Sequence, residues 1–144
     1  MSKFNNANFD HASLNEVNVK RSTFQKAIFT EANLSQSNIR LSNLSDTNMQ
    51  DAKLNDTDFL GSAFILANMS RANLTKAKMF FVNMTGATLN NANLYQADLN
   101  NTTLKKASLK ETILIEAKFN NADLVGTALE KENLSEAIPR VSHQ

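Results

Sequence analysis

A large apolar residue recurs at every fifth position along almost the whole chain. The register begins at Phe4 and ends at Leu134, and all 27 of its positions hold Leu, Phe, Met, Val or Ile. A period of five fits neither an α-helix, which repeats every 3.6 residues, nor a strand, which alternates every two. On a helix, five residues turn the chain by about 500°, so these side chains would spread over every side. The backbone must instead turn a corner every five residues around one apolar interior.

A small residue precedes each of these apolar centres by two positions. Of the 27 small positions, 14 hold Ala, ten hold Ser or Thr, two hold Val, and Glu132 is the exception. The residue directly before the centre favours Asn and Asp, and the two after it are mostly polar. All three glycines lie two residues after a centre, at a phase where a turn needs the positive φ that Gly adopts freely. Each unit therefore directs one large and one small side chain inward.

The repeated triplets carry a family resemblance, as in Ala32-Asn33-Leu34 and Ala97-Asp98-Leu99. They resemble the pentapeptide-repeat family, whose motif reads roughly Ala-(Asp/Asn)-Leu-X-X, over about residues 2–136. The resemblance implies an all-β fold, a right-handed quadrilateral β-helix in which four pentapeptides make one square coil. It predicts a solenoid of about seven coils over residues 1–136, with a C-terminal tail or cap over residues 137–144. Coils stacked about 4.8 Å apart would make a rod of about 33 Å.

Residues 20 apart in sequence should then stack in neighbouring coils. One inward column is leucine at every level from Leu14 to Leu134, as expected for a core. One outward column alternates in sign, which predicts a ladder of exposed ion pairs worth a few tenths of a kcal/mol each. Its members are Asp58, Lys78, Asp98 and Lys118.

Two neighbouring corners carry apolar residues where water is expected. An exposed apolar cluster around two phenylalanines is typical of a contact site, although the rings could also fold onto neighbouring corners. The predicted partner-binding residues are Leu41, Leu60, Ile65, Leu66, Phe80 and Phe81.

Charge and composition exclude several classes of protein. The net charge is +1, with seven basic and seven acidic residues in positions 1–72 and eight and seven in positions 73–144. Neither the basic stripe of a nucleic-acid binder nor the acidic surface of a DNA mimic is evident, so no direct nucleic-acid binding is expected. Cysteine is absent and no apolar run suits a secretory signal or a membrane span, so a cytoplasmic protein is expected. The family resemblance implies a bacterial origin.

Catalytic groups are missing from the pattern, and we expect no enzyme activity and no cofactor. The histidines, His11 and His143, are far apart, and no nucleophile with a nearby base or glycine-rich phosphate loop is present. A metal site is also not expected, because carboxylates wrapped around one coil point away from one another. These carboxylates belong to Asp46, Asp51, Asp56 and Asp58.

The ends of a stacked rod expose unpaired backbone and apolar core. At the C-terminal end, Ala137, Ile138 and Val141 could cover the last coil, which Glu132 is expected to loosen. At the other end, only three residues precede Phe4. We therefore expect an end-to-end homodimer, or another partner that covers the N-terminal coil.

Two functions follow as expectations. A rigid rod without a pocket suits a non-enzymatic protein-interaction or scaffold module with an unknown protein partner. The family resemblance also implies an alternative, a DNA-mimicking protein of the quinolone-resistance type that binds DNA gyrase.

Overall fold

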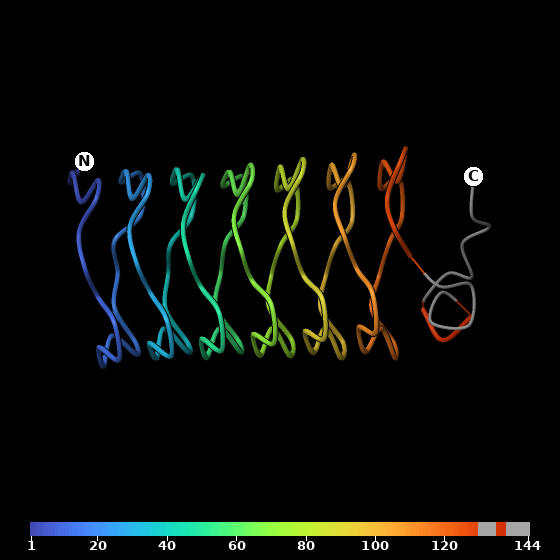
Figure 1. Cartoon of the computed structure of the whole chain (residues 1–144), viewed down its shortest axis with the longest axis horizontal. Helices are drawn as coiled ribbons and strands as arrows, with labels where there is room; N and C mark the ends of the chain where they lie inside the picture. Colours follow the sequence, from blue (N-terminus) through green and yellow to red (C-terminus); the bar gives the residue numbers. More distant parts are fainter. Residues whose placement is uncertain (130–134, 138–144) are drawn as a thin grey trace.

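The computed structural model is a rod of stacked square coils (Figure 1). It describes residues 1–129 and 135–137. Parallel β-bridges join each residue that precedes a centre to the residue 20 positions further on, from Lys3↔Thr23 to Ser108↔Ala128. Within the described ranges there is no helix, and the only strand-like pairings are these isolated bridges, because the chain turns before a second residue can pair. The 20-residue spacing confirms four pentapeptides per coil.

Backbone hydrogen bonds join each coil to the next along the rod. The Phe24 N–H donates to the Asn43 carbonyl at 2.7 Å, and the Asn43 N–H donates to the Ser22 carbonyl at 2.9 Å. At the corner, the Lys26 N–H donates to the Ser45 carbonyl at 3.1 Å. Each face is therefore a parallel ladder whose donors and acceptors are used inside the rod.

Each corner is a turn whose third residue has a positive φ. Every such residue from Asn6 to Gly126 has a φ between 55° and 70°, and 22 of these residues are not glycine. The predicted positive φ is thus confirmed, but glycine is not required for it. Gly61 and Gly86 serve a second purpose, because a Cβ atom on either would lie 2.7 Å from a Cδ2 atom, that of Leu41 or Leu66 respectively. Each of these leucines lies across the glycine of the following coil.

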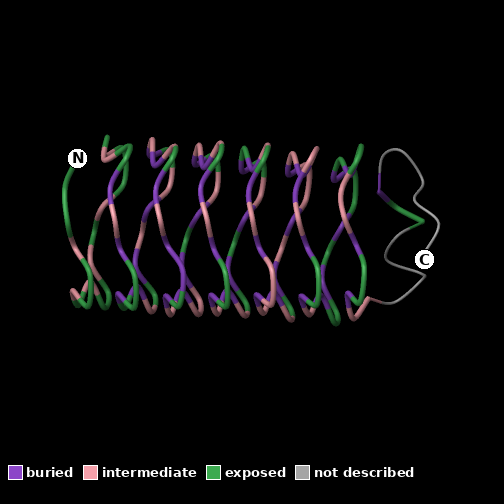
Figure 2. Ribbon diagram, turned by 90° about the horizontal axis from the view of Figure 1, so that it is seen from above, coloured by how far each residue is buried: buried purple, intermediate pink, exposed green. Residues whose placement is uncertain are grey.

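From the second coil onward, most centres and most small residues are buried, and the buried positions recur from coil to coil along the rod (Figure 2). Every level of the leucine column from Leu34 to Leu114 is buried, as predicted. The N-terminal part of the core is aromatic: the rings of Phe4 and Phe24 stack with centroids 5.0 Å apart, and Phe9 and Phe29 do the same.

Buried serine hydroxyls replace the direct turn hydrogen bond at three corners. In a typical corner the Ala27 N–H donates to the Phe24 carbonyl at 3.0 Å. At the corner from Ile39 to Ser42, the Ser42 N–H donates instead to Ser62 Oγ at 3.0 Å, and Ser62 Oγ donates to the Ile39 carbonyl at 2.7 Å. Ser37 and Ser42 bridge the corners below them in the same way. Serine at a small position therefore ties one coil to the next.

The register changes by one residue near the C-terminal end. A regular corner N–H donates to the carbonyl 19 residues ahead, as Gln96 does to Ile115 at 3.0 Å, whereas Glu116 donates to Glu136, 20 residues ahead, at 2.9 Å. Ala137 is buried and joins the core. The predictions for Glu132, Leu134, Ile138 and Val141 lie outside the described residues. In the described part of the chain, no helix has the length and apolar character of a membrane span.

Candidate interaction surface

The six predicted contact residues lie on one side of the rod. We call this side the patch face. It has a row of residues in the middle, running from Thr23 through Ala63 to Thr103, and a corner on each edge. The first corner contains Leu41, Leu60, Phe80 and Phe81, and the second contains Ile65 and Leu66.

Four of the six side chains are open to solvent. The exposed fractions are 50% for Leu41, 62% for Leu66 and 59% for Phe81, and Ile65 is also exposed at 37%. Leu60 and Phe80 are only half-buried. Leu60 and Phe80 therefore form the base of the patch, and the other four side chains form its solvent-exposed surface.

The two phenylalanine rings form an edge-to-face pair. The centroids of Phe80 and Phe81 are 4.5 Å apart, with 78° between the ring planes. This contact fixes the orientation of the Phe81 ring relative to Phe80, because the edge of one ring is attracted to the face of the other. A preorganised exposed ring is a typical anchor for a partner.

Charge is sorted by face, which the even distribution along the sequence concealed. On residues 1–129, the patch face and its two corners carry seven basic and two acidic side chains. The opposite face and its two corners carry seven acidic and four basic side chains. The patch face thus has a local charge of +5, and its basic members are Lys3, Lys20, Arg21, Lys26, Arg40, Lys105 and Lys106.

The basic side chains lie on both sides of the apolar patch along the rod. On the N-terminal side, a hollow of about 300 Å³ is lined by Lys20, Arg21, Asn38, Arg40 and Leu41. On the C-terminal side are Lys105 and Lys106, both exposed. Leu41 therefore connects the basic hollow directly to the apolar patch.

Two of these cations already have acidic neighbours. Arg40 Nε lies 3.8 Å from Asp58 Oδ2, and Lys105 Nζ lies 3.2 Å from Asp123 Oδ2. For Lys20, Arg21, Lys26 and Lys106, the described part of the molecule shows no ion pair.

The prediction of an ion-pair ladder is correct for the stacking of the residues but wrong for the pairing of their charged groups. The backbones of Asp58, Lys78, Asp98 and Lys118 do stack as successive β-bridges. Their charged groups, however, form no ion pairs with one another in the part that the structure describes. The reason is local: Asp58 Oδ1 accepts the Leu60 N–H at 3.1 Å and Asp98 Oδ1 accepts the Asn100 N–H at 3.1 Å, which holds each carboxylate at its own corner.

Other chemistry-bearing groups do not converge. His11 lies near Glu31, with Nδ1 3.4 Å from Oε2, but on an exposed corner. His143 lies outside the described residues. Over residues 1–129 and 135–137, no three His, Asp or Glu side chains gather in a way that would hold a metal ion.

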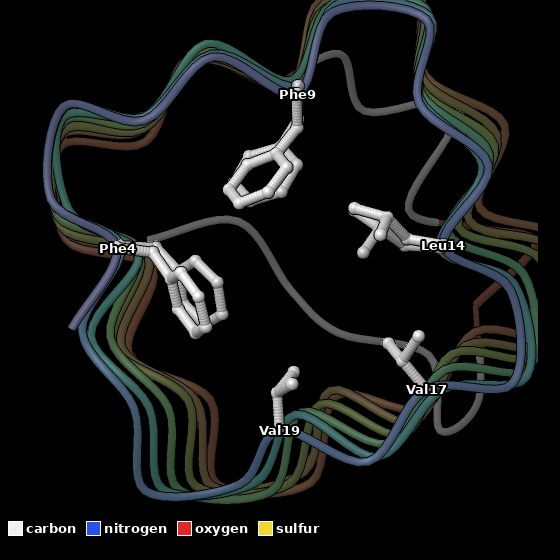
Figure 3. A pocket seen from close by; sticks show the side chains of 8 residues that line it. Phe4, Phe9, Leu14, Val17 and Val19 are labelled. Carbon is white, nitrogen blue, oxygen red and sulfur yellow. The ribbon is translucent and has the colours of Figure 1, made fainter. Parts of the chain in front are cut away.

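The N-terminal end of the core is a second apolar surface (Figure 3). Phe4, Phe9, Leu14, Val17 and Val19 point into the square and line a hollow of about 130 Å³. These side chains are only half-buried, whereas the centres of the next coil are buried.

Comparisons with known proteins agree with this architecture. The sequence matches the family described as Pentapeptide repeats, in eight copies over residues 2–40, 42–79, 77–114 and 92–130. A pentapeptide repeat protein from the thylakoid lumen of Arabidopsis thaliana is similar in structure, with a TM-score of 0.58 and 30% identity over 59% of each chain. QnrB1, a plasmid-mediated fluoroquinolone resistance protein, aligns in a trypsin-treated form with a TM-score of 0.59 and 18% identity, over 94% of this chain and 76% of its own. No curated protein matches the chain.

The chain belongs to the pentapeptide-repeat family, and its fold is the right-handed quadrilateral β-helix. Proteins of this family are generally non-enzymatic structural or interaction modules. This chain covers only 59% of the length of the Arabidopsis protein. The similarity therefore supports the same fold and says nothing of the role of the whole Arabidopsis protein.

Proposed function

We propose that this protein is a non-enzymatic interaction module that binds a protein partner through the patch face. The observation that supports this function most is the exposed apolar cluster around the ring pair of Phe80 and Phe81. Leu41, Leu66 and Phe81 are exposed within three successive coils, and an exposed apolar cluster that includes an aromatic ring is typical of a contact site.

A capture experiment tests this function. Tagged wild-type protein and the Phe80→Ser/Phe81→Ser variant are incubated with lysate of the source organism, and bound proteins are quantified. The matched control is Ile113→Ser/Ile115→Ser, which removes two exposed isoleucines (45% and 41%) from the opposite side of the rod. Loss of a bound protein from the phenylalanine variant alone would support the proposal. Equal capture by all three proteins would remove the patch from consideration.

Gyrase binding of the quinolone-resistance type is the second candidate. The acidic opposite face is the observation that favours it. Against it, Lys53, Arg71, Lys76 and Lys110 interrupt that face, and the protein as a whole has a net charge of +1. A supercoiling assay with purified gyrase tests this candidate. If micromolar protein neither inhibits the enzyme nor rescues it from the drug, the candidate is dismissed.

We also propose that the N-terminal coil pairs with a second copy of the chain. The apolar hollow at that end supports this, as do the N–H groups of Lys3, Asn8, Ser13 and Asn18, to which no acceptor is assigned within the described part of the rod. Stacked coils normally use these groups in the ladder, so they favour another coil above them.

A bacterial cytoplasm remains the predicted setting of this module. Fractionation of source cells with an antibody against the protein would test it. Recovery in a membrane, periplasmic or lumenal fraction would contradict the prediction.

A further inference from the structure

The apolar patch and the basic groups of the patch face together define the chemistry of a partner. We propose that the partner of this face is an acidic amphipathic helix of another protein. This inference rests on the proposed interaction function and specifies what binds. The apolar side chains of the partner helix would cover Leu41, Leu66 and Phe81. The carboxylates of the helix would lie near the basic groups beyond each end of the patch.

Charge complementarity favours an acidic partner. Lys20, Arg21 and Arg40 line, together with Leu41, a hollow of about 300 Å³. Lys105 and Lys106 stand beyond the opposite end of the patch. The acidic neighbours Asp58 and Asp123 offset only one cation at each end, so the surplus positive charge is left for the partner.

The backbone of the patch face favours a helix over an extended peptide. A strand that adds to a sheet needs free N–H and C=O groups. Here the Ala63 N–H donates to the Ser42 carbonyl, and the Phe64 N–H donates to the Asn83 carbonyl, so the rungs are already used. A helix satisfies its own backbone and presents only side chains, which is what this face can bind.

The dimensions of the face fit a short helix lying along the rod. From the coil of Lys20 to the coil of Lys105 there are four coil spacings, which is about 19 Å. A helix of about 13 residues has that length. Ala63 leaves room for the helix between the two corners at the centre of the patch, where Asn43 and Asn83 are its neighbours in the row. The apolar residues of the helix would recur at intervals of three and four.

Nucleic acid fits this face less well. Phosphates would need a continuous basic track, whereas the corners between the two basic groups carry the exposed aliphatic side chains of Leu41, Ile65 and Leu66. Of the patch side chains, only Phe81 offers an exposed ring that could stack on a base. The test therefore includes DNA as a competing probe.

Fluorescence anisotropy with defined probes tests the inference. The probe is a labelled synthetic helix of about 15 residues with Leu and Phe on one face and Glu at both ends. Its counterparts are the same peptide with Lys in place of Glu, and a short DNA duplex. The protein variants are Lys20→Glu/Arg21→Glu, which reverses charge beside the patch, and Lys76→Glu/Lys110→Glu, which makes the same change in net charge on other corners.

The acidic probe should bind at least about tenfold more tightly than the lysine peptide, and the Lys20→Glu/Arg21→Glu variant should lose about tenfold in affinity. The Lys76→Glu/Lys110→Glu control should bind within about twofold of the wild type. Equal or tighter binding of the lysine peptide or of DNA would overturn the inference, as would no binding of the acidic probe. An equal loss in the control variant would overturn it too.

The capture experiment separates this inference from the proposed function. If the native partner is lost from the Phe80→Ser/Phe81→Ser variant but retained in full by Lys20→Glu/Arg21→Glu, the interaction function stands and the acidic partner is wrong. If the phenylalanine variant captures as the wild type does, the function of the patch itself fails.

Discussion

The third residue of every corner has the least favourable backbone in the coil. A positive φ costs a non-glycine residue about 1 kcal/mol, and 22 such residues occur here. The chain tolerates them because the corner N–H is bonded to the next coil at every corner from Asn6 to Lys106, as Gln36 is to Asn55 at 3.0 Å. The cost remains, however, and single residues could be relieved of it.

Replacement of Gln36 by glycine should stabilise the protein. Gln36 is exposed and has a φ of 59°, so Gln36→Gly removes backbone strain, and we expect a gain of up to about 1 kcal/mol in the free energy of unfolding. The matched control is Gln25→Gly, because Gln25 is exposed at the preceding turn position, where φ is not positive, and should lose about 0.5–1 kcal/mol. Urea unfolding measures both, and a loss at both positions would contradict the account.

Asparagine and aspartate before the centre have a local structural role. Asn73 Oδ1 accepts the Thr75 N–H at 3.1 Å, and Asn33 does the same for Ser35 at 3.0 Å. This N–H points out of the ladder, so the side chain supplies its acceptor. The preference for Asn and Asp is plain in the sequence, but the N–H group that the side chain accepts is not. That group can be identified only when the structure shows which backbone groups the coil leaves unused.

Acid should destabilise the fold through two carboxylates. The hydrogen bonds from Arg71 to Asp51 lower the pKa of Asp51, and the hydrogen bond from the Val125 N–H, followed by that from Lys105, lowers the pKa of Asp123. The ordinary pKa, about 3.9, holds in the unfolded chain, so the stabilisation is present above it. It is lost as pH falls through the lower folded values. Urea midpoints should therefore fall between pH 5 and pH 2 (values set about the ordinary pKa). The drop should be smaller in Asp51→Asn/Asp123→Asn, and an unchanged drop would contradict this source.

At the scale of the element, neighbouring coils are joined by side chains as well as by the ladder. The serine bridges make the small position more than a space-filling one. The sequence alone does not show that Ser or Thr at this position has a different structural role from Ala, because all three residues are small. Their bridging role requires the position of the next coil.

Loss of one bridging hydroxyl should be costly. Ser62→Ala leaves the buried Ser42 N–H and Ile39 carbonyl without their bridge, and we expect a loss of about 1–2 kcal/mol in the free energy of unfolding. Ser70→Ala removes a hydroxyl that bonds only Asn68 Oδ1 on the outside, and should cost less than about 0.5 kcal/mol. Equal costs in denaturant titrations would show that the corner closes without help.

At the scale of the whole molecule, the coil, its 20-residue register and its core are confirmed predictions. These features can be predicted from the sequence because all of them depend on the five-residue period of the apolar centres. The sorting of charge by face and the contacts of Leu41 and Leu66 with glycine do not follow from that period. Counting charge in columns 20 residues apart would have found the first. The second depends on how a side chain leans, which no spacing shows.

The proposed pairing of N-terminal coils also belongs to this scale. Light scattering at high micromolar concentration should give the mass of a dimer. Phe4→Lys/Phe9→Lys places charge in the apolar hollow and should give a monomer, because two charged ends cannot be buried against each other. A monomer mass for the wild type would exclude the pairing.

Photo-crosslinking in cells tests the central claim, that the patch face is where a partner binds. Benzoylphenylalanine is introduced in place of Leu66 on the patch face or Ile115 on the opposite side, two aliphatic side chains that are both exposed. We predict a discrete adduct with another protein from position 66 and none from position 115. No adduct from position 66, or equal adducts from both positions, would contradict the account.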